Sequence, residues 1–213
     1  MMDEEFWHGK WRRGEIAFHE ADGNPLLRRY FPRLDLPAGA RLFLPLCGKT
    51  RDIAWLLAQG HAVAGAELSR LAIEQLFAEL GLVPHITPVG PLERFEAGRL
   101  TVFVGNLFDL DRHALGEVGA IYDRAALVAL PEPMRPRYAA HLVHLTHAAP
   151  QLLIAFDYEP SLVVGPPFAV PEPEIRRHYG AAYHVTLAGR HELKEGLKGR
   201  KPVEETVWLL RPR

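Results

Sequence analysis

Apolar residues along the chain alternate between short continuous runs and segments with helical spacing. The apolar run at 41–45 predicts a buried strand. Apolar positions at 53–57 recur with helical spacing, and Gly60 is placed to end that helix. A second short strand is predicted at 61–66, and it ends at Glu67. The chain therefore begins its ordered part as strand, turn, helix, strand and acid.

A second helix follows, because Ser69 is a good N-cap and Gly81 a good end. Further strands are predicted at 100–104, 119–122, 152–156, 183–188 and 203–210, with a helix at about 134–148. Strands that alternate with helices form a doubly wound, mostly parallel sheet. The last two strands are separated by a polar loop and predict a C-terminal antiparallel hairpin. We expect a single α/β domain over residues 1–213.

Composition and charge narrow the class of protein. The chain has 213 residues, 48% of them hydrophobic and 24% charged, with a formal net charge of -1. That balance gives no electrostatic reason to expect nucleic acid or an anionic membrane as a partner. The single Cys47 indicates a reducing compartment. No secretory signal or membrane span is expected, so the sequence predicts a soluble, cytoplasmic protein, and without a heptad seam we expect a monomer.

The first strand-to-helix turn and the acid after it predict a binding site. Gly48 lets a ligand approach the backbone, and Glu67 follows Leu46 by 21 positions, where an acid can hold a ribose diol. The turn has none of the further glycines of a GxGxxG motif, so a pyrophosphate has no tight cradle. NAD and S-adenosyl-L-methionine both present a ribose diol. Two plainer interpretations stay open: Gly48 merely makes a turn, and Glu67 is a solvated acid at a helix start.

Two later strand ends carry further candidates. Leu107 is placed to cover a base face, while Asn106 or an adjacent amide satisfies a base edge; the alternative is a loop with a buried leucine. Asp123 and Arg124 end another strand, where the planar fork of Arg124 could bind an anionic group. An ordinary Asp/Arg surface pair is the alternative for that site.

The N-terminal segment is rich in aromatic rings, among them Trp11 and Phe18. Such rings either cover a ligand as a lid or anchor a leading helix in the core. No metal site is expected, because the chain has no HExxH motif and no cysteine pair, and the histidines at 141, 144 and 147 have no carboxylate or thiolate in register.

Several motifs occur together in order along the chain. They are FWHGKWRRGEIAFHEADGNPLL at 6–27, LFLPLCGKTRDIAWLLAQGHAVAGAELS at 42–69, NLFDL at 106–110, YDRAALVAL at 122–130 and GPPFAVPEPEI at 165–175. On these motifs the chain resembles the thiopurine S-methyltransferase family, in its bacterial form, over nearly its full length. The resemblance implies a Rossmann-like class I methyltransferase fold that uses S-adenosyl-L-methionine.

The resemblance also implies roles for particular residues. Residues 1–25 would form a lid over the cofactor. The cofactor positions fall on Trp11, Leu46, Glu67, Asn106, Leu107 and Arg124, and the acceptor positions on Phe18, Pro167 and Phe168. Arg124 and Asp157 are the catalytic candidates, Asp157 for contact with the acceptor or for water-mediated proton removal. Lys198 and Arg200 are candidates for a second basic residue in the acceptor pocket.

The implied reaction is methyl transfer to the sulfur of thiopurines or of other aromatic or heterocyclic thiols, in a xenobiotic or metalloid detoxification role. The partner is a small-molecule thiol or metalloid acceptor. The alternative within methyl transfer is an enzyme for halide, selenium or tellurium anions. An NAD-dependent oxidoreductase has less support because the glycines are missing, and a non-catalytic binding module is the remaining alternative.

Overall fold

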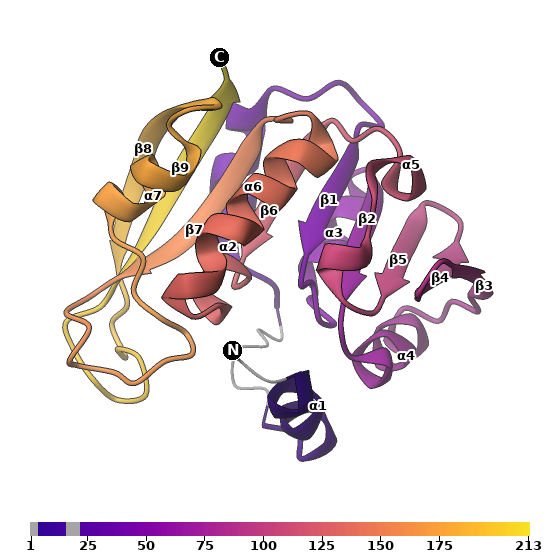
Figure 1. Ribbon diagram of the computed structural model, residues 1–213, viewed down its shortest axis with the longest axis horizontal. Coiled ribbons are helices and arrows are strands. Elements are labelled where there is room, and N and C mark those ends of the chain that lie inside the picture. The colour runs from indigo at the N-terminus through magenta and orange to yellow at the C-terminus, as the bar shows by residue number, and fades with distance from the viewer. Residues whose placement is uncertain (1–3, 16–21) are drawn as a thin grey trace. The chain divides into compact units, whose positions relative to one another are not determined.

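The computed structural model describes residues 4–15 and 22–213 (Figure 1). The helices are α1 (Glu4–Arg12), α2 (Pro25–Tyr30), α3 (Asp52–Ala58), α4 (Arg70–Glu79), α5 (Arg112–Leu115), α6 (Arg135–Thr146) and α7 (Glu172–Tyr179). The strands are β1 (Arg41–Pro45), β2 (Ala62–Glu67), β3 (His85–Val89), β4 (Leu92–Ala97), β5 (Leu100–Val104), β6 (Ala120–Arg124), β7 (Gln151–Asp157), β8 (Tyr183–Glu192) and β9 (Glu204–Pro212). Among these residues no helix has the length and apolar character needed to cross a membrane.

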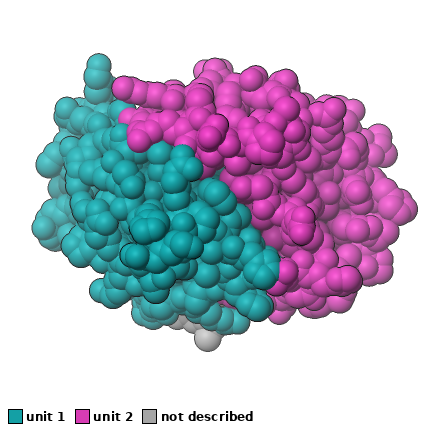
Figure 2. Space-filling view, turned by 90° about the horizontal axis from the view of Figure 1, so that it is seen from above, with its two compact units in different colours: residues 1, 121–213 teal, residues 2–120 magenta. Residues whose placement is uncertain are grey.

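The chain divides into two compact units, one spanning residues 2–120 and the other 121–213 (Figure 2). Each unit contains strands and the helices that cover them. The prediction of a single domain stays a prediction, and each unit is described by itself below.

In the first unit the strands follow the order β3-β4-β5-β2-β1. β1, β2 and β5 run parallel, as predicted from their short apolar runs. The strands are buried on both faces, as expected for parallel strands covered by helices. Ser69 caps α4, since its hydroxyl accepts a hydrogen bond from the Ala72 amide at 3.3 Å. The strand–helix–strand–helix order predicted from the sequence is confirmed here.

The β3–β4 hairpin was not predicted. Its two strands are antiparallel, and β4 also pairs with β5 in an antiparallel manner. Every residue of β3 is exposed or only half-buried, and in β4 just Leu92 and Phe95 are buried. Two buried residues three positions apart do not give the alternating pattern by which a half-buried strand is recognised. The hairpin therefore has no clear signal in the sequence.

In the second unit the strands follow the order β6-β7-β9-β8. β6 and β7 are parallel, and β9 is antiparallel to both β7 and β8. The predicted C-terminal antiparallel hairpin is therefore confirmed, although both of its strands are longer than predicted. In Figure 1, α6 crosses in front of β6 and β7, and α7 lies in front of β8 and β9.

Two long loops of the second unit, 158–170 and 193–203, share a small apolar core of their own. Tyr158, Val163 and Val203 are buried there, and apolar residues of both loops pack around them. We call this the loop cluster. Figure 1 shows the two loops side by side, below the ends of β7, β8 and β9. The loops thus carry a small core of their own, which meets the sheet at Phe156 in β7.

Gly65 in β2 gives a test of the packing in the first unit. A Cβ at this position would lie 2.8 Å from the Sγ of Cys47, too close for two such atoms. We expect Gly65→Ala to lower the free energy of unfolding by about 1–3 kcal/mol, as overpacking does in other cores. Urea denaturation measures the change.

The matched variant is Cys47→Ala, which removes the clashing sulfur. The double variant Gly65→Ala/Cys47→Ala should recover most of the stability lost by Gly65→Ala. Additive losses in the double variant would show that the sulfur is not the cause.

Candidate functional site

The turns after β1, β2 and β5 are tied together at one edge of the sheet in the first unit. The Cys47 amide donates to the carbonyl of Ala66 at 3.0 Å, and the Gly105 amide donates to the carbonyl of Glu67 at 2.9 Å. The strands also end in step with one another in the parallel register. The carboxyl edge of parallel strands is where ligands bind in open α/β sheets.

The turn after β1 is conformationally strained. Leu46 has a φ of 48° and Gly48 a φ of 52°, both in the left-handed region. Glycine adopts this region freely, whereas a leucine there costs on the order of 1–3 kcal/mol. Strain of this kind persists where the surrounding structure fixes it, commonly at binding sites. The surrounding structure therefore keeps the backbone of Leu46 in a strained conformation, as is common at binding sites.

Glu67 is fixed by backbone amides at the end of β2. Its side chain is buried, with the residue 7% exposed. One carboxylate oxygen accepts a hydrogen bond from the Gly48 amide at 2.9 Å, and the other accepts from the Ser69 amide at 2.8 Å. Burial raises the pKa of Glu67, and these amides oppose the rise. The interpretation of Glu67 as a solvated acid is therefore wrong.

Trp11 is a second reason, besides the positive φ, for glycine at position 48. A Cβ on Gly48 would lie 3.1 Å from the indole ring of Trp11, which is itself buried. The indole of α1 thus packs against the turn after β1. The described part of the predicted lid, residues 4–15 and 22–25, belongs to the first unit. Phe18 lies outside the described residues.

The side chain of Asn106 is engaged within the first unit. Its oxygen accepts a hydrogen bond from the Phe108 amide at 3.0 Å, and its nitrogen donates to a carboxylate oxygen of Glu4 at 2.9 Å. Asn106 therefore shapes its own turn and ties α1 to it. Leu107 beside it is buried. Both residues lie on the turn after β5, next to the end of β2.

These residues fit an adenosine-type ligand that carries no phosphate. Backbone amides in such turns and at helix starts normally bind an anion, but here the amide of Gly48, in the turn after β1, and that of Ser69, at the N-cap of α4, both donate to Glu67. A buried carboxylate with remaining lone pairs suits the two hydroxyls of a ribose. S-adenosyl-L-methionine has that diol and no phosphate, so the donor set fits it better than a pyrophosphate-containing dinucleotide.

The second unit places two candidate residues at the ends of parallel strands. Arg124 ends β6 and Asp157 ends β7, and Arg124 is paired in register with Ile154. Ala125, directly after Arg124, has a φ of 68°, so the chain turns sharply there. This non-glycine turn at a strand end parallels the one at Leu46.

Asp123 does not form a surface pair with its neighbour. It is fully buried, and its carboxylate accepts hydrogen bonds from the Tyr138 hydroxyl at 2.7 Å and the Leu127 amide at 3.2 Å. Burial raises the pKa of Asp123 from 3.8 to about 6. The surface-pair interpretation is therefore wrong for Asp123, which instead fixes the turn that follows Arg124.

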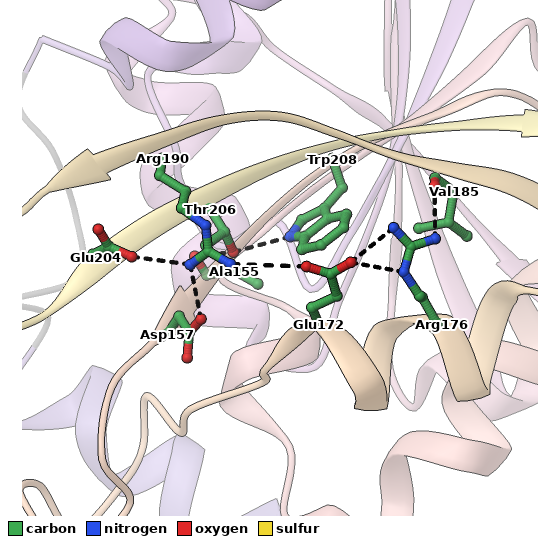
Figure 3. Close-up of polar contacts among 9 residues, drawn as sticks. All are labelled: Ala155, Asp157, Glu172, Arg176, Val185, Arg190, Glu204, Thr206 and Trp208. Atoms are coloured by element: carbon green, nitrogen blue, oxygen red, sulfur yellow. Dashed lines mark hydrogen bonds and ion pairs between the residues drawn. The ribbon is translucent and has the colours of Figure 1, made fainter.

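Asp157 lies in a network of ionic contacts (Figure 3). A guanidinium nitrogen of Arg190 lies 3.0 Å from its carboxylate and 2.9 Å from that of Glu204. The other terminal nitrogen of Arg190 lies 3.8 Å from Glu172, which also accepts from Arg176 at 2.8 Å. Arg190 thus joins the end of β7 to both strands of the C-terminal hairpin and to the start of α7.

The loop with the GPPF motif is anchored at several points. The Phe168 amide donates to the carbonyl of Val128 at 2.7 Å, and the Tyr158 hydroxyl donates to the carbonyl of Pro167 at 2.7 Å. Both predicted acceptor residues, Pro167 and Phe168, are half-buried in the second unit. The loop is therefore held by the segment after Arg124 and by the loop cluster.

Lys198 and Arg200 lie at the tip of the second long loop, in a tight turn closed by backbone pairing of Leu197 with Arg200. The Lys198 ammonium donates to the carbonyl of Val164 at 3.1 Å, so it links the two long loops. Arg200 is exposed.

Two arginines of the second unit were not predicted as functional residues. Arg190 belongs to a strand that was expected to end at residue 188, so its contact with Asp157 was not foreseen. Arg135 begins α6, and its partners lie up to 39 residues away along the chain. Local patterns do not reveal contacts at that separation, so only the folded structure shows them.

Known proteins resemble this chain over nearly its whole length. The family model for thiopurine S-methyltransferase matches residues 2–212. A thiopurine S-methyltransferase of Xanthobacter autotrophicus is 54% identical over 98% of this chain and 99% of its own length. One from Gluconobacter oxydans is 52% identical over 97% of this chain and 94% of its own length.

Solved structures share the fold. The 1,6-didemethyltoxoflavin-N1-methyltransferase of Burkholderia thailandensis, solved with S-adenosylhomocysteine, has a TM-score of 0.67 at 18% identity and covers 98% of this chain and 86% of its own. A SAM-dependent methyltransferase from Anabaena variabilis has a TM-score of 0.66 at 16% identity, with coverage of 98% and 95%. The predicted class I methyltransferase fold is confirmed.

The buried Asp123 predicts a pH dependence of stability. In the folded chain it keeps its proton up to about pH 6, whereas unfolded it ionises near its usual 3.8. A raised carboxyl pKa lowers stability as pH rises between these values, here by about 3 kcal/mol. The comparison is the difference in the free energy of unfolding between the natural chain and Asp123→Asn. We expect this difference to fall by about 3 kcal/mol from pH 4 to pH 7.

Urea denaturation across this pH range measures the difference, and the subtraction cancels the other carboxylates. Parallel curves for the two proteins would contradict a buried, proton-binding Asp123.

Proposed function

Because the chain belongs to the thiopurine S-methyltransferase family of S-adenosyl-L-methionine-dependent enzymes, we propose that it methylates the sulfur of thiopurines or of other aromatic or heterocyclic thiols. The observation that carries the cofactor site is the buried carboxylate of Glu67, held by the amides of Gly48 and Ser69. The chain uses S-adenosyl-L-methionine, which supplies an electrophilic methyl group on a sulfonium.

We assign the cofactor to the residues gathered in the first unit. Arg124 stays a predicted cofactor residue on the family resemblance alone. Glu67 would accept hydrogen bonds from the ribose hydroxyls, and its fixed carboxylate needs no rearrangement to do so. Leu107 would cover the base. Trp11, packed over the turn at Gly48, would close the site and keep water out.

Arg124 would recognise the acceptor as an anion. An aromatic thiol ionises more readily than an alkyl thiol, so the sulfur reaches the site as a thiolate and needs little help from a general base. A guanidinium favours that charge, and the turn fixed by Asp123 sets where it lies. Catalysis then rests chiefly on holding sulfur and methyl in line.

Asp157 remains our candidate for contact with the acceptor or for water-mediated proton removal. Its ion pair with Arg190 at 3.0 Å fixes the carboxylate in place. Pro167 and Phe168 would form part of the acceptor wall, and Phe18, outside the described residues, a further part. Lys198 and Arg200 are candidates for a second basic residue in that pocket.

A transfer assay with labelled S-adenosyl-L-methionine identifies the acceptor. The panel contains thiopurines, thiophenols, alkyl thiols, and halide, selenium and tellurium anions. Fastest transfer to aromatic thiols supports the proposal, whereas volatile methylated products from the anions alone would replace it with the metalloid and halide alternative. A detoxification role, a cytoplasmic location and a monomeric state stay predictions.

Glu67→Ala tests the cofactor assignment. We expect the dissociation constant for S-adenosylhomocysteine to rise by about tenfold or more, because two hydrogen bonds to a charged group are lost. Isothermal titration calorimetry measures it. Glu74→Ala, which removes an exposed carboxylate of α4, should leave the affinity unchanged. Equal affinity in the Glu67 variant and the natural chain would refute the assignment.

Arg124→Ala tests the acceptor role. We expect kcat/KM for the thiol to fall by about a hundredfold, as the loss of one preorganised donor does elsewhere. Arg124→Lys keeps the charge without the planar fork and should recover part of the loss. Steady-state kinetics with both substrates varied measure these effects, and unaltered constants in Arg124→Ala would exclude the role.

A further inference from the structure

Arg135, outside the predicted site, is buried with a full charge. It is 3% exposed, and it begins α6. Its Nε donates to the carbonyl of Leu130 at 2.9 Å, and one terminal nitrogen contacts both carboxylate oxygens of Glu174 at 2.9 Å. The same nitrogen donates to the carbonyl of Ala169 at 3.2 Å. One guanidinium thus joins three segments of the second unit.

The guanidinium also lies over the ring of Phe168, 5.5 Å from its centre. Phe168 is the aromatic residue of the proposed acceptor wall, and Ala169 follows it. A guanidinium over a ring face attracts it electrostatically. Arg135 therefore holds both the side chain of Phe168 and the backbone next to it.

The carbonyl of Leu130 extends this connection toward Arg124. The segment 124–130 is fixed at its start by Asp123, which accepts from the Leu127 amide at 3.2 Å. It is fixed at its end by Arg135, through Leu130. Its middle accepts the Phe168 amide at 2.7 Å, through Val128. The spacing between the Arg124 turn and the Phe168 wall is thereby set from both sides.

Stability alone gives little reason for this arrangement. A buried ion pair often contributes no more than well-packed apolar side chains of the same volume, because both charges must leave water. An apolar pair at 135 and 174 would keep the helices together. Apolar side chains could not donate hydrogen bonds to the carbonyls of Leu130 and Ala169, whereas the planar guanidinium of Arg135 donates to both.

We propose that Arg135 is a positioning residue that fixes the acceptor wall at Phe168 relative to Arg124, and so sets the size and shape of thiol that the enzyme accepts. The inference rests on the proposed function for its substrate. The structural part of the inference, that Arg135 fixes the loop at Phe168, is independent of the proposed function. Glu174 supports Arg135, and His178 in turn contacts Glu174 at 3.1 Å.

The test uses a variant without the two charges. Arg135→Met/Glu174→Gln leaves no unpaired buried charge, and the amide oxygen of the new glutamine keeps an acceptor for His178. We expect the variant to stay folded. The matched control is Arg94→Met/Glu96→Gln, the same two replacements in a partly exposed ion pair of β4 with the atoms 3.5 Å apart.

The first measurement is amide hydrogen exchange, followed by mass spectrometry, in the protein without added acceptor. The Phe168 and Val170 amides are hydrogen-bonded to Val128 and Phe156, respectively. In the charge-free variant we expect exchange of peptides covering 168–170 to speed up about tenfold, with peptides of β1 and β2 unchanged. Unchanged exchange at 168–170, or a uniform increase along the chain, would overturn the proposal.

The second measurement separates positioning from general damage. We expect KM for a bulky aromatic thiol to rise about tenfold, with kcat and the dissociation constant for S-adenosylhomocysteine within about twofold of the natural values. The ratio of kcat/KM between small and bulky thiols should move closer to one. A loss shared equally by cofactor affinity, kcat and KM would mark Arg135 as merely structural.

The proposal can still be tested if no thiol is methylated or if the charge-free variant does not fold. If no thiol of the panel is methylated by the natural chain, the proposed function fails while the exchange experiment still tests the fixed loop. If the charge-free variant does not fold, Arg135→Lys takes its place, since it keeps the charge but loses the fork and the flat face over Phe168. Natural exchange rates at 168–170 in that variant would overturn the proposal.

Discussion

The carboxylate of Glu67, bonded to the amides of Gly48 and Ser69, is the interaction on which the first unit's site depends. It joins the turn after β1 to the start of α4 through one side chain. It also engages the amides of Gly48, in the turn after β1, and of Ser69, at the N-cap of α4, so that neither is free to bind a phosphate. The strain at Leu46 is tolerated because this bond and the backbone pairing of Cys47 fix the turn. Binding selectivity and local stability thus share one set of bonds.

The sequence predicted this part well because its determinants are local. The strand at 41–45, the turn and Glu67 occur within one strand–helix–strand unit, whose geometry follows from short apolar runs and from glycine at the turn. It did not predict that the indole of Trp11, from a helix well before this unit along the chain, packs against Gly48. The β3–β4 hairpin was missed because its exposed residues give no alternation.

The second unit was harder to predict, because its determinants are buried polar groups with distant partners. Asp123 looked like half of a surface pair, and only its burial beside Tyr138 shows otherwise. Arg135 carries no signal in its own neighbourhood, since Glu174 lies 39 residues away. Such groups add little net stability, but they hold segments at defined distances. The resemblance to a known family located the GPPF loop, whereas the structure identifies what fixes it.

The loop cluster has a consequence for how the enzyme can evolve. Tyr158, Val163 and Val203 pack with one another, with residues of the same two loops and with Phe156 near the end of β7. Insertions or substitutions in these loops therefore alter a small satellite core and leave the strands that carry Glu67 undisturbed. Under the proposed function, selection on these loops retunes which acceptor is methylated, while the ability to bind the methyl donor is inherited unchanged. A lineage with this fold would then gain a new acceptor by altering loops alone.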